Sequence, residues 1–134
     1  MNVHSRLWYV WLLFLYLPVS LAAAENTERL DPQVRTEIDY LLNRVQASGY
    51  VFIRNGKEHD GTDAAEHMQR KFEHFLDDGD IETVDDFIDR AGTKSLITGR
   101  EYLVRLPDGT EIPTAQWLRA EIAARRTTAA EVSR

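Results

Sequence analysis

Apolar side chains recur at helical spacing in four stretches of this chain. The first stretch predicts a helix over residues 32–48, in which Asp31 caps the N-terminus and Pro32 occupies the first turn, where a missing N–H is tolerated. Gly49 suits the left-handed position that often follows a helix end. The predicted buried stripe comprises Val34, Ile38, Leu41, Leu42 and Val45.

A second stripe predicts a helix that starts at Thr62 or Asp63 and ends within residues 77–80. Asp63 and Glu66 have the three-residue spacing of a capping box, in which side chain and backbone pair reciprocally. The side chains expected to be buried are Ala64, Ala65, Met68, Phe72, Phe75 and Leu76.

Two shorter patterns predict a third and a fourth helix. Thr83 and Asp86 again have capping-box spacing, and Gly92 is the expected end of the third helix. Thr114 is the expected N-cap of the last helix, and residues 127–134 are expected to form a frayed C-terminal tail. The side chains predicted to face inward are Val84, Phe87, Ile88, Ala91, Trp117, Leu118 and Ile122.

Extended segments are few. Residues 50–53 are β-branched or aromatic and predict a short strand, which the turn signal Asn55-Gly56 follows. Residues 57–60 are too polar to predict a partner strand, so we expect the turn to lead into a helix.

A second extended segment lies between the third and fourth helices. Residues 102–106 predict a strand, residues 107–109 a turn and residues 110–112 a returning strand. Because the strands are so few, the helices must supply most of the core. The sequence therefore predicts a mostly helical α+β fold, with about four helices and a small antiparallel β element, in one compact domain over residues 25–126.

The first 24 residues have the three parts of a secretory signal peptide. A short stretch with one arginine precedes an unbroken apolar run over residues 7–17, and small residues end the segment at Ala22-Ala23-Ala24. The competing interpretation is an uncleaved anchor, because residues 7–24 carry no charge and approach the roughly 20 residues of a membrane span. Pro18 weakens that interpretation. We therefore expect cleavage near Ala24-Glu25 and a periplasmic protein with no stable membrane span.

Composition limits the chemistry of the exported part. Of 134 residues, 110 follow residue 24; none is cysteine, and their net charge is −7, because Arg6 leaves with the signal peptide. Disulfides, thiol chemistry and a lipid-modified cysteine are excluded. An acidic domain is also not expected to bind nucleic acid or anionic lipid through a general basic field.

Histidines and acids do not form a convincing metal site. His67 and His74 lie on one side of the second helix but are about 10 Å apart, too far to share an ion. Asp63 with His67 could start a site, but its nearest third ligand is His59. The acidic run over residues 77–89 lacks the glycine and the final glutamate of an EF-hand loop. We expect no metal and no cofactor.

Ser95 lies in a polar loop before Gly99, as reactive serines often do. However, neither a G-x-S-x-G nor an S-x-x-K motif surrounds it. The preferred interpretation is a loop capped by hydroxyl groups.

Arg54 precedes the turn Asn55-Gly56 and follows a predicted buried strand. This position suits presentation of the planar guanidinium to a carboxylate or phosphate. The preferred interpretation is internal pairing with an acid such as Asp86 or Glu66.

The motif F-I-R-N-G at residues 52–56, followed by A-A-E-H-M at residues 64–68 and by Lys71, resembles the YfeK-like proteins, which are small exported bacterial proteins of unknown function. The resemblance covers most of the chain after Glu37. It implies export and a single compact domain, and no activity. The further matching positions are Phe72, Asp86, Phe87, Ile88, Ser95, Gly99, Tyr102, Val104, Trp117 and Leu118.

The chain departs from that family in lacking two cysteines. Family members carry one shortly before the motif phenylalanine and one at the end of the later strand, where this chain has Tyr50 and Leu106. The resemblance implies that these two residues touch and that the two strands lie close together.

These observations favour a non-enzymatic binding or interaction domain of the bacterial envelope, with an envelope protein or a small ligand as its partner. The candidate polar cluster comprises Arg54, Asn55, His67, Lys71 and Ser95. One alternative is a hydrolase of a cell-envelope substrate, with His67 as base and Ser95 or a water as nucleophile. Another is a structural partner in an envelope complex, which predicts an exposed apolar patch of several hundred Å².

Overall fold

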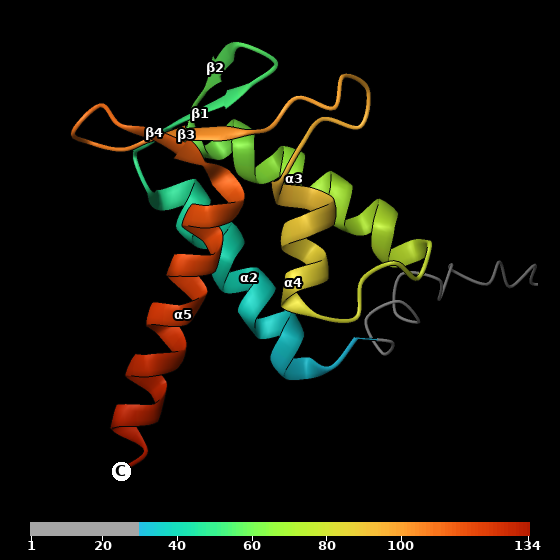
Figure 1. Cartoon of the computed structure of the whole chain (residues 1–134). Coiled ribbons are helices and arrows are strands. Elements are labelled where there is room, and N and C mark those ends of the chain that lie inside the picture. Colours follow the sequence, from blue (N-terminus) through green and yellow to red (C-terminus); the bar gives the residue numbers. More distant parts are fainter. Residues whose placement is uncertain (1–29) are drawn as a thin grey trace, which may run out of the picture.

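The computed structural model describes residues 30–134, so the predicted signal peptide and its cleavage site lie outside the described residues. Helices α2, α3 and α5 and the shorter α4 form the body, and a small antiparallel sheet lies across one end of them (Figure 1). The predicted α+β, mostly helical fold is confirmed.

Helix α2 (Pro32–Ala47) begins as predicted. The Asp31 carboxylate accepts the backbone N–H of Gln33 at 2.7 Å, which satisfies one of the unpaired donors at the helix start. Ile38, Leu41 and Val45 are fully buried and form the centre of its core face.

Strands β1 (Val51–Arg54) and β2 (Lys57–His59) form a hairpin, so the expectation of no partner strand is wrong. Asn55 and Gly56 have φ values of 53° and 77°, and two successive positive φ angles make the tight turn that returns a chain antiparallel to itself. The polar residues Lys57 and Glu58 are exposed on an edge strand, where charge is favourable. The geometry of the turn, and not the composition of residues 57–59, therefore determines that this segment forms a strand.

Helix α3 (Gly61–Asp77) starts earlier than expected. Its N-cap is Asp60, whose carboxylate accepts the N–H of Asp63 at 2.9 Å, so the predicted capping by Asp63 is wrong. A Cβ atom on Gly61 would lie 2.4 Å from the carbonyl oxygen of Val45. Glycine thus allows α3 to start directly against the end of α2.

The third predicted helix consists of two joined segments. Thr83 and Asp86 form the predicted capping box at the start of α4 (Val84–Phe87), which continues as a π-helical segment, η1 (Ile88–Gly92). A Cβ on Gly92 would lie 2.6 Å from the Leu118 side chain, so glycine lets η1 pack closely against α5.

The sheet has the order β2-β1-β3-β4, with β3 (Leu103–Arg105) and β4 (Glu111–Pro113) joined by the predicted turn. Strands β1 and β3 pair with Val51 opposite Arg105. Extending that register by one position places Tyr50 opposite Leu106, and both side chains pack against the core. The implied proximity of the two strands is confirmed.

Thr114 is the first residue of α5 (Thr114–Val132) and does not cap it with its side chain. The N-cap position belongs to Pro113. Thr114 is fully buried, and its N–H donates to the Tyr102 carbonyl at 2.9 Å. The expected N-cap is therefore wrong, because Thr114 completes the junction between sheet and helix.

Helix α5 also continues through the segment expected to fray and ends only at Val132. The Arg126–Glu37 ion pair, at 2.7 Å, and the Arg125 guanidinium, 4.4 Å from the Tyr40 ring centre, hold its middle against α2. Residues 127–132 contain neither glycine nor proline and include alanines, which favour continuation of the helix. In Figure 1 this last part of α5 extends beyond the other helices.

Candidate functional site

Asn55 and Ser95 connect the β1–β2 turn to the loop that precedes β3. Asn55 Nδ2 donates to Ser95 Oγ at 3.4 Å, and Thr98 Oγ1 donates to Asn55 Oδ1 at 2.6 Å. The Ser95 hydroxyl oxygen also accepts the backbone N–H groups of Ile97 and Thr98, both at 3.3 Å. Ser95 is therefore a loop cap, in agreement with the preferred prediction.

Lys71 anchors the same loop from α3. Its ammonium donates to the Lys94 carbonyl oxygen at 2.8 Å and lies 5.1 Å from the centre of the Tyr102 ring. The side chain is buried, and burial lowers the Lys71 pKa from 10.5 to about 8, because it disfavours the charged form. Lys71 thus connects α3 to the loop before β3 and to the Tyr102 ring.

His67 lies one helical turn before Lys71 and contacts the same tyrosine. His67 Nε2 and the Tyr102 hydroxyl are 3.1 Å apart, and the two rings meet edge to face. Burial, followed by the positive charges of Arg54 and Lys71, lowers the His67 pKa from 6.5 to about 4. His67 is therefore neutral near pH 7, and the Tyr102 hydroxyl, whose pKa burial raises, can donate to it.

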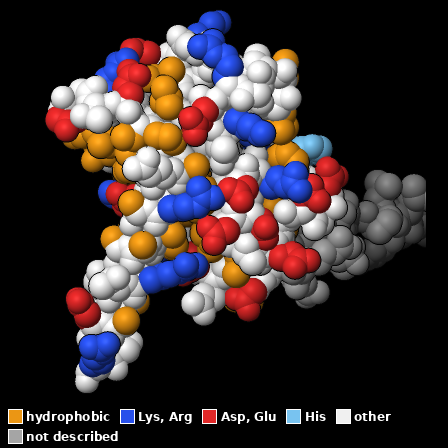
Figure 2. Space-filling view, viewed as in Figure 1, with side chains coloured by type: hydrophobic (Ala, Val, Ile, Leu, Met, Phe, Trp, Pro, Cys, Tyr) orange, Lys and Arg blue, Asp and Glu red, His pale blue; other side chains and the backbone are white. Residues whose placement is uncertain are grey.

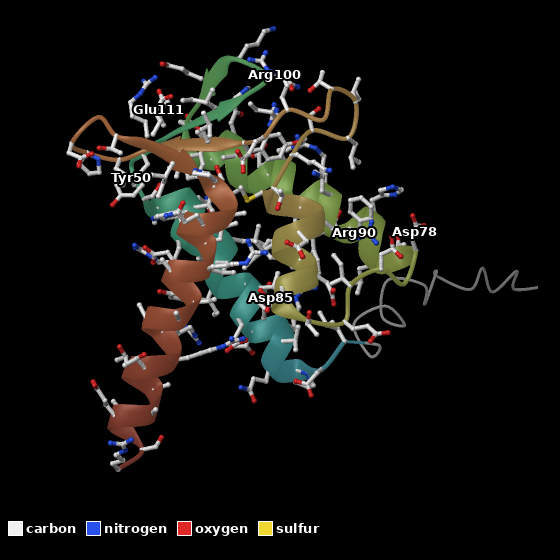
Figure 3. All side chains as sticks on the ribbon, in the orientation of Figure 1. Tyr50, Asp78, Asp85, Arg90, Arg100 and Glu111 are labelled. Atoms are coloured by element: carbon white, nitrogen blue, oxygen red, sulfur yellow. The ribbon has the colours of Figure 1, made fainter. Side chains whose placement is uncertain are left out.

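Arg54 has no carboxylate within ion-pair distance among the described residues, so the expected internal pairing is wrong. Asp86, one proposed partner, instead accepts hydrogen bonds at the α4 capping box. The Arg100 guanidinium lies against Gly56, on the other side of the turn, and Figure 3 places Arg100 at this end of the molecule. We call residues 54–57 together with residues 94–100 the cationic end.

A small cavity lies beside these residues, between β1, α3 and the start of α5. Its volume is about 20 Å³. The Thr114 hydroxyl oxygen is fully buried and has no hydrogen-bond partner in the described part of the chain. The lining residues are Phe52, Ile53, Arg54, His59, Ala64, His67, Met68, Tyr102 and Thr114.

The predicted cluster is thus partly assembled. Arg54 and His67 line the cavity, whereas Asn55, Ser95 and Lys71 hold the adjoining loop. Ser95 does not line the cavity, and its oxygen is occupied by loop hydrogen bonds. The arrangement gives no support to a Ser95 nucleophile activated by His67, because a base must lie within hydrogen-bond reach of its nucleophile.

Sequence reasoning missed Tyr102, Thr98 and Arg100 as parts of this site. Sequence reasoning identifies Tyr102 as a strand residue and as a position that matches the family resemblance, but not as a contact of both His67 and Lys71. Thr98 lies in the segment identified only as a polar loop, and Arg100 directly follows that loop. A threonine and an arginine flanking Gly99 were the available signal, but their partners at residues 55 and 56 are remote in sequence.

The other sites considered from sequence are not assembled. Over residues 30–134, no group of three or more histidine or acidic side chains is arranged to hold a metal ion. His59 pairs with Asp63 at 3.4 Å, on the rim of the cavity. Within this same described range, no helix is long and apolar enough to cross a membrane.

Comparison with protein family models shows to which family the chain belongs. A family model described as a family of unknown function, DUF5329, matches residues 32–126. The chain belongs to this family. The match spans α2 through most of α5, and therefore the whole cluster. Neither a curated protein nor a solved structure matches the chain significantly, and nothing in these comparisons confirms the YfeK-like resemblance.

Proposed function

We propose that this DUF5329 member is an exported, non-enzymatic binding domain of the bacterial envelope, and that it recognises an anionic partner through its cationic end. Export is proposed from the three-part pattern of residues 1–24. Recognition of an anionic partner is proposed from the distribution of paired and unpaired charge.

The observation that carries the proposal is that four basic side chains without a carboxylate partner lie together at this end, whereas six of the arginines elsewhere in residues 30–134 are ion-paired. Among the described residues, no carboxylate lies within ion-pair distance of the four basic residues of the cationic end, which are Arg54, Lys57, Lys94 and Arg100. In contrast, carboxylates lie within 4 Å of Arg35, Arg44, Arg90, Arg105, Arg119 and Arg126.

Preorganisation supports binding at this end. Lys71 fixes the start of the loop, and Asn55 ties its middle to the hairpin turn. A loop held in this way loses little conformational freedom when a partner binds, which favours affinity. The overall charge of −7 after signal cleavage excludes a general basic field but not a local cationic one.

The two alternatives have less support. The hydrolase loses support for Ser95 as its nucleophile, because the Ser95 oxygen accepts loop hydrogen bonds and does not line the cavity that His67 lines. The purely structural partner predicts a broad apolar patch, but the exposed large apolar side chains of residues 30–134 are only Leu96, Ile97 and Val132.

Retention on a cation exchanger at pH 7 tests anion binding. We expect the processed protein to be retained despite its acidic composition, and Arg54→Gln and Arg100→Gln to elute at lower salt. Arg119→Gln is the matched control, because it removes the same charge from a side chain already paired with Asp85 and Asp89. Equal elution of all three variants would contradict the proposal.

Export is tested separately by mass spectrometry of a periplasmic extract. We expect the mature chain to start at Glu25, because residues 22–24 match a signal-peptidase site. A protein that retains residues 1–24, or that is found only in the cytoplasm, would contradict this part of the proposal.

A further inference from the structure

The loop of the cationic end exposes two consecutive large apolar side chains. Leu96 is 62% exposed and Ile97 is 95% exposed, at the tip of the loop between Lys94 and Arg100. Exposed apolar residues are common singly, but two adjacent ones at a convex tip favour contact with an apolar phase or a partner.

Hydrogen bonds on both sides of the tip fix the loop conformation in which Leu96 and Ile97 are exposed. Ser95, immediately before the tip, is 5% exposed and caps the N–H groups of Ile97 and Thr98. The buried Lys71 ammonium holds the residue before it, and Asn55 holds Thr98 after it. The backbone on both sides of Leu96 and Ile97 is therefore held in place by hydrogen bonds.

Charge around the tip is mainly positive. Residues 54–57 and 94–100 contain four basic residues and no acid. Glu101 follows the loop, and Glu58 follows the turn but pairs with Arg105 at 2.7 Å. A net positive rim therefore surrounds the two apolar side chains.

An acidic run begins at the C-terminal end of α3, and Arg90 and Arg119 pair with three of its acids. Residues 77–89 contain seven acids and no basic residue, and they follow the C-terminal end of α3. Helix α3 is about 25 Å long, so Asp77, Asp78 and Asp80, at its C-terminal end, lie well away from the hairpin, which precedes its N-terminal end. Figure 3 places Asp78 and Asp85 away from Arg100, and Figure 2 shows basic side chains at the hairpin end, beside acidic ones, and further basic side chains along the helices.

We infer that this end docks onto an anionic lipid surface, with Leu96 and Ile97 entering the interface and the four basic residues at headgroup depth. The inference rests on the proposed function and names the anionic partner. A convex apolar tip within a cationic rim matches a bilayer surface, which offers apolar depth beneath negative headgroups. The acids at the C-terminal end of α3 are repelled by the same surface, which favours an orientation with that end turned away.

Vesicle flotation of the processed protein tests the inference. We expect flotation with vesicles of mixed phosphatidylglycerol and phosphatidylcholine, a decrease with added salt, and no flotation with phosphatidylcholine alone. The double variant Leu96→Ser/Ile97→Ser should bind about tenfold or more weakly, because the buried apolar area is lost. Arg100→Gln should bind about fivefold more weakly.

Val132→Ser is the matched control, because Val132 is 84% exposed but lies at the far end of α5. It should bind like the wild type. Thermal unfolding of each variant checks the fold, which should be unchanged because the replaced side chains are exposed.

The outcomes separate the two proposals. If the wild type is retained on the cation exchanger but does not float with anionic vesicles, the lipid inference is overturned, the proposed function stands, and an acidic protein surface becomes the partner. Binding of the double variant equal to that of the wild type also overturns the inference. If the protein binds neither the exchanger nor the vesicles, both proposals fail.

Discussion

His67 and Lys71 are two titratable side chains of α3 that contact Tyr102. Burial favours the neutral form of each. Both were selected from sequence, since they belong to one motif and lie four residues apart on a helix. Their common partner, Tyr102, could not be selected, because no local pattern connects residue 102 with residues 67 and 71. Long-range contacts made by single side chains leave no periodic signal in a sequence.

The His67 environment predicts a pH dependence of stability. Its pKa is 6.5 in an unfolded chain and about 4 in the folded one, so between these values only the unfolded state binds the proton. Lowering the pH through this window therefore favours unfolding. We expect the free energy of unfolding, measured by denaturant titration, to decrease less from pH 6.5 to pH 4 in His67→Gln than in the wild type.

His74→Gln is the control for that experiment, because His74 lies on the same helix with its side chain 61% exposed. It should retain the pH dependence of the wild type. The same pH dependence in His67→Gln and in the wild type would show that burial of His67 does not control its titration.

The buried Thr114 hydroxyl gives a second prediction for a single residue. Buried polar groups in folded proteins are nearly always hydrogen-bonded, and the adjoining cavity of about 20 Å³ has room for one water molecule. We therefore expect a water in this cavity to form a hydrogen bond with the Thr114 hydroxyl. Thr114→Val should then destabilise the domain by about 1 kcal/mol in denaturant titrations, because that hydrogen bond is lost. A valine variant more stable than the wild type would show that the hydroxyl is unpaired.

At the scale of elements, the helices were predictable and two of their starts were not. Apolar stripes identified α2, α3, α4 and α5 because each helix buries one face. Asp60 and Pro113 were missed as N-caps because capping depends on which residue leaves the helical conformation, and several nearby polar residues competed for that position. The polar strand β2 was missed because its turn, and not its composition, specifies it.

Close packing at the start of α3 predicts the effect of one added methyl group. Gly61→Ala places a Cβ against the carbonyl oxygen of Val45, which belongs to the backbone and cannot rotate away. We expect a loss of about 1–3 kcal/mol in the free energy of unfolding, typical of overpacking. Thr62→Ala, at the adjacent exposed position, is the control and should change stability little; a Gly61→Ala variant as stable as the wild type would contradict the packing.

At the scale of the whole molecule, four basic residues without a carboxylate partner gather at one end of the domain. The hairpin turn and the loop before β3 carry these four residues, and the acidic run extends from the end of α3 through α4 into η1. The sequence showed the acidic run, because it is continuous. It did not show the cationic end, because residues 54–57 and 94–100 are brought together only by the fold, through Asn55, Ser95 and Thr98.

The central claim is that the cationic end is the binding surface, and NMR titration of the processed, isotope-labelled protein with a short oligoglutamate peptide tests it most directly. The account predicts that the largest amide shift changes fall in residues 54–57 and 94–100, that residues 77–89 change little, and that the changes diminish with added salt. Shift changes centred elsewhere, or none at peptide concentrations in large excess, would contradict the account.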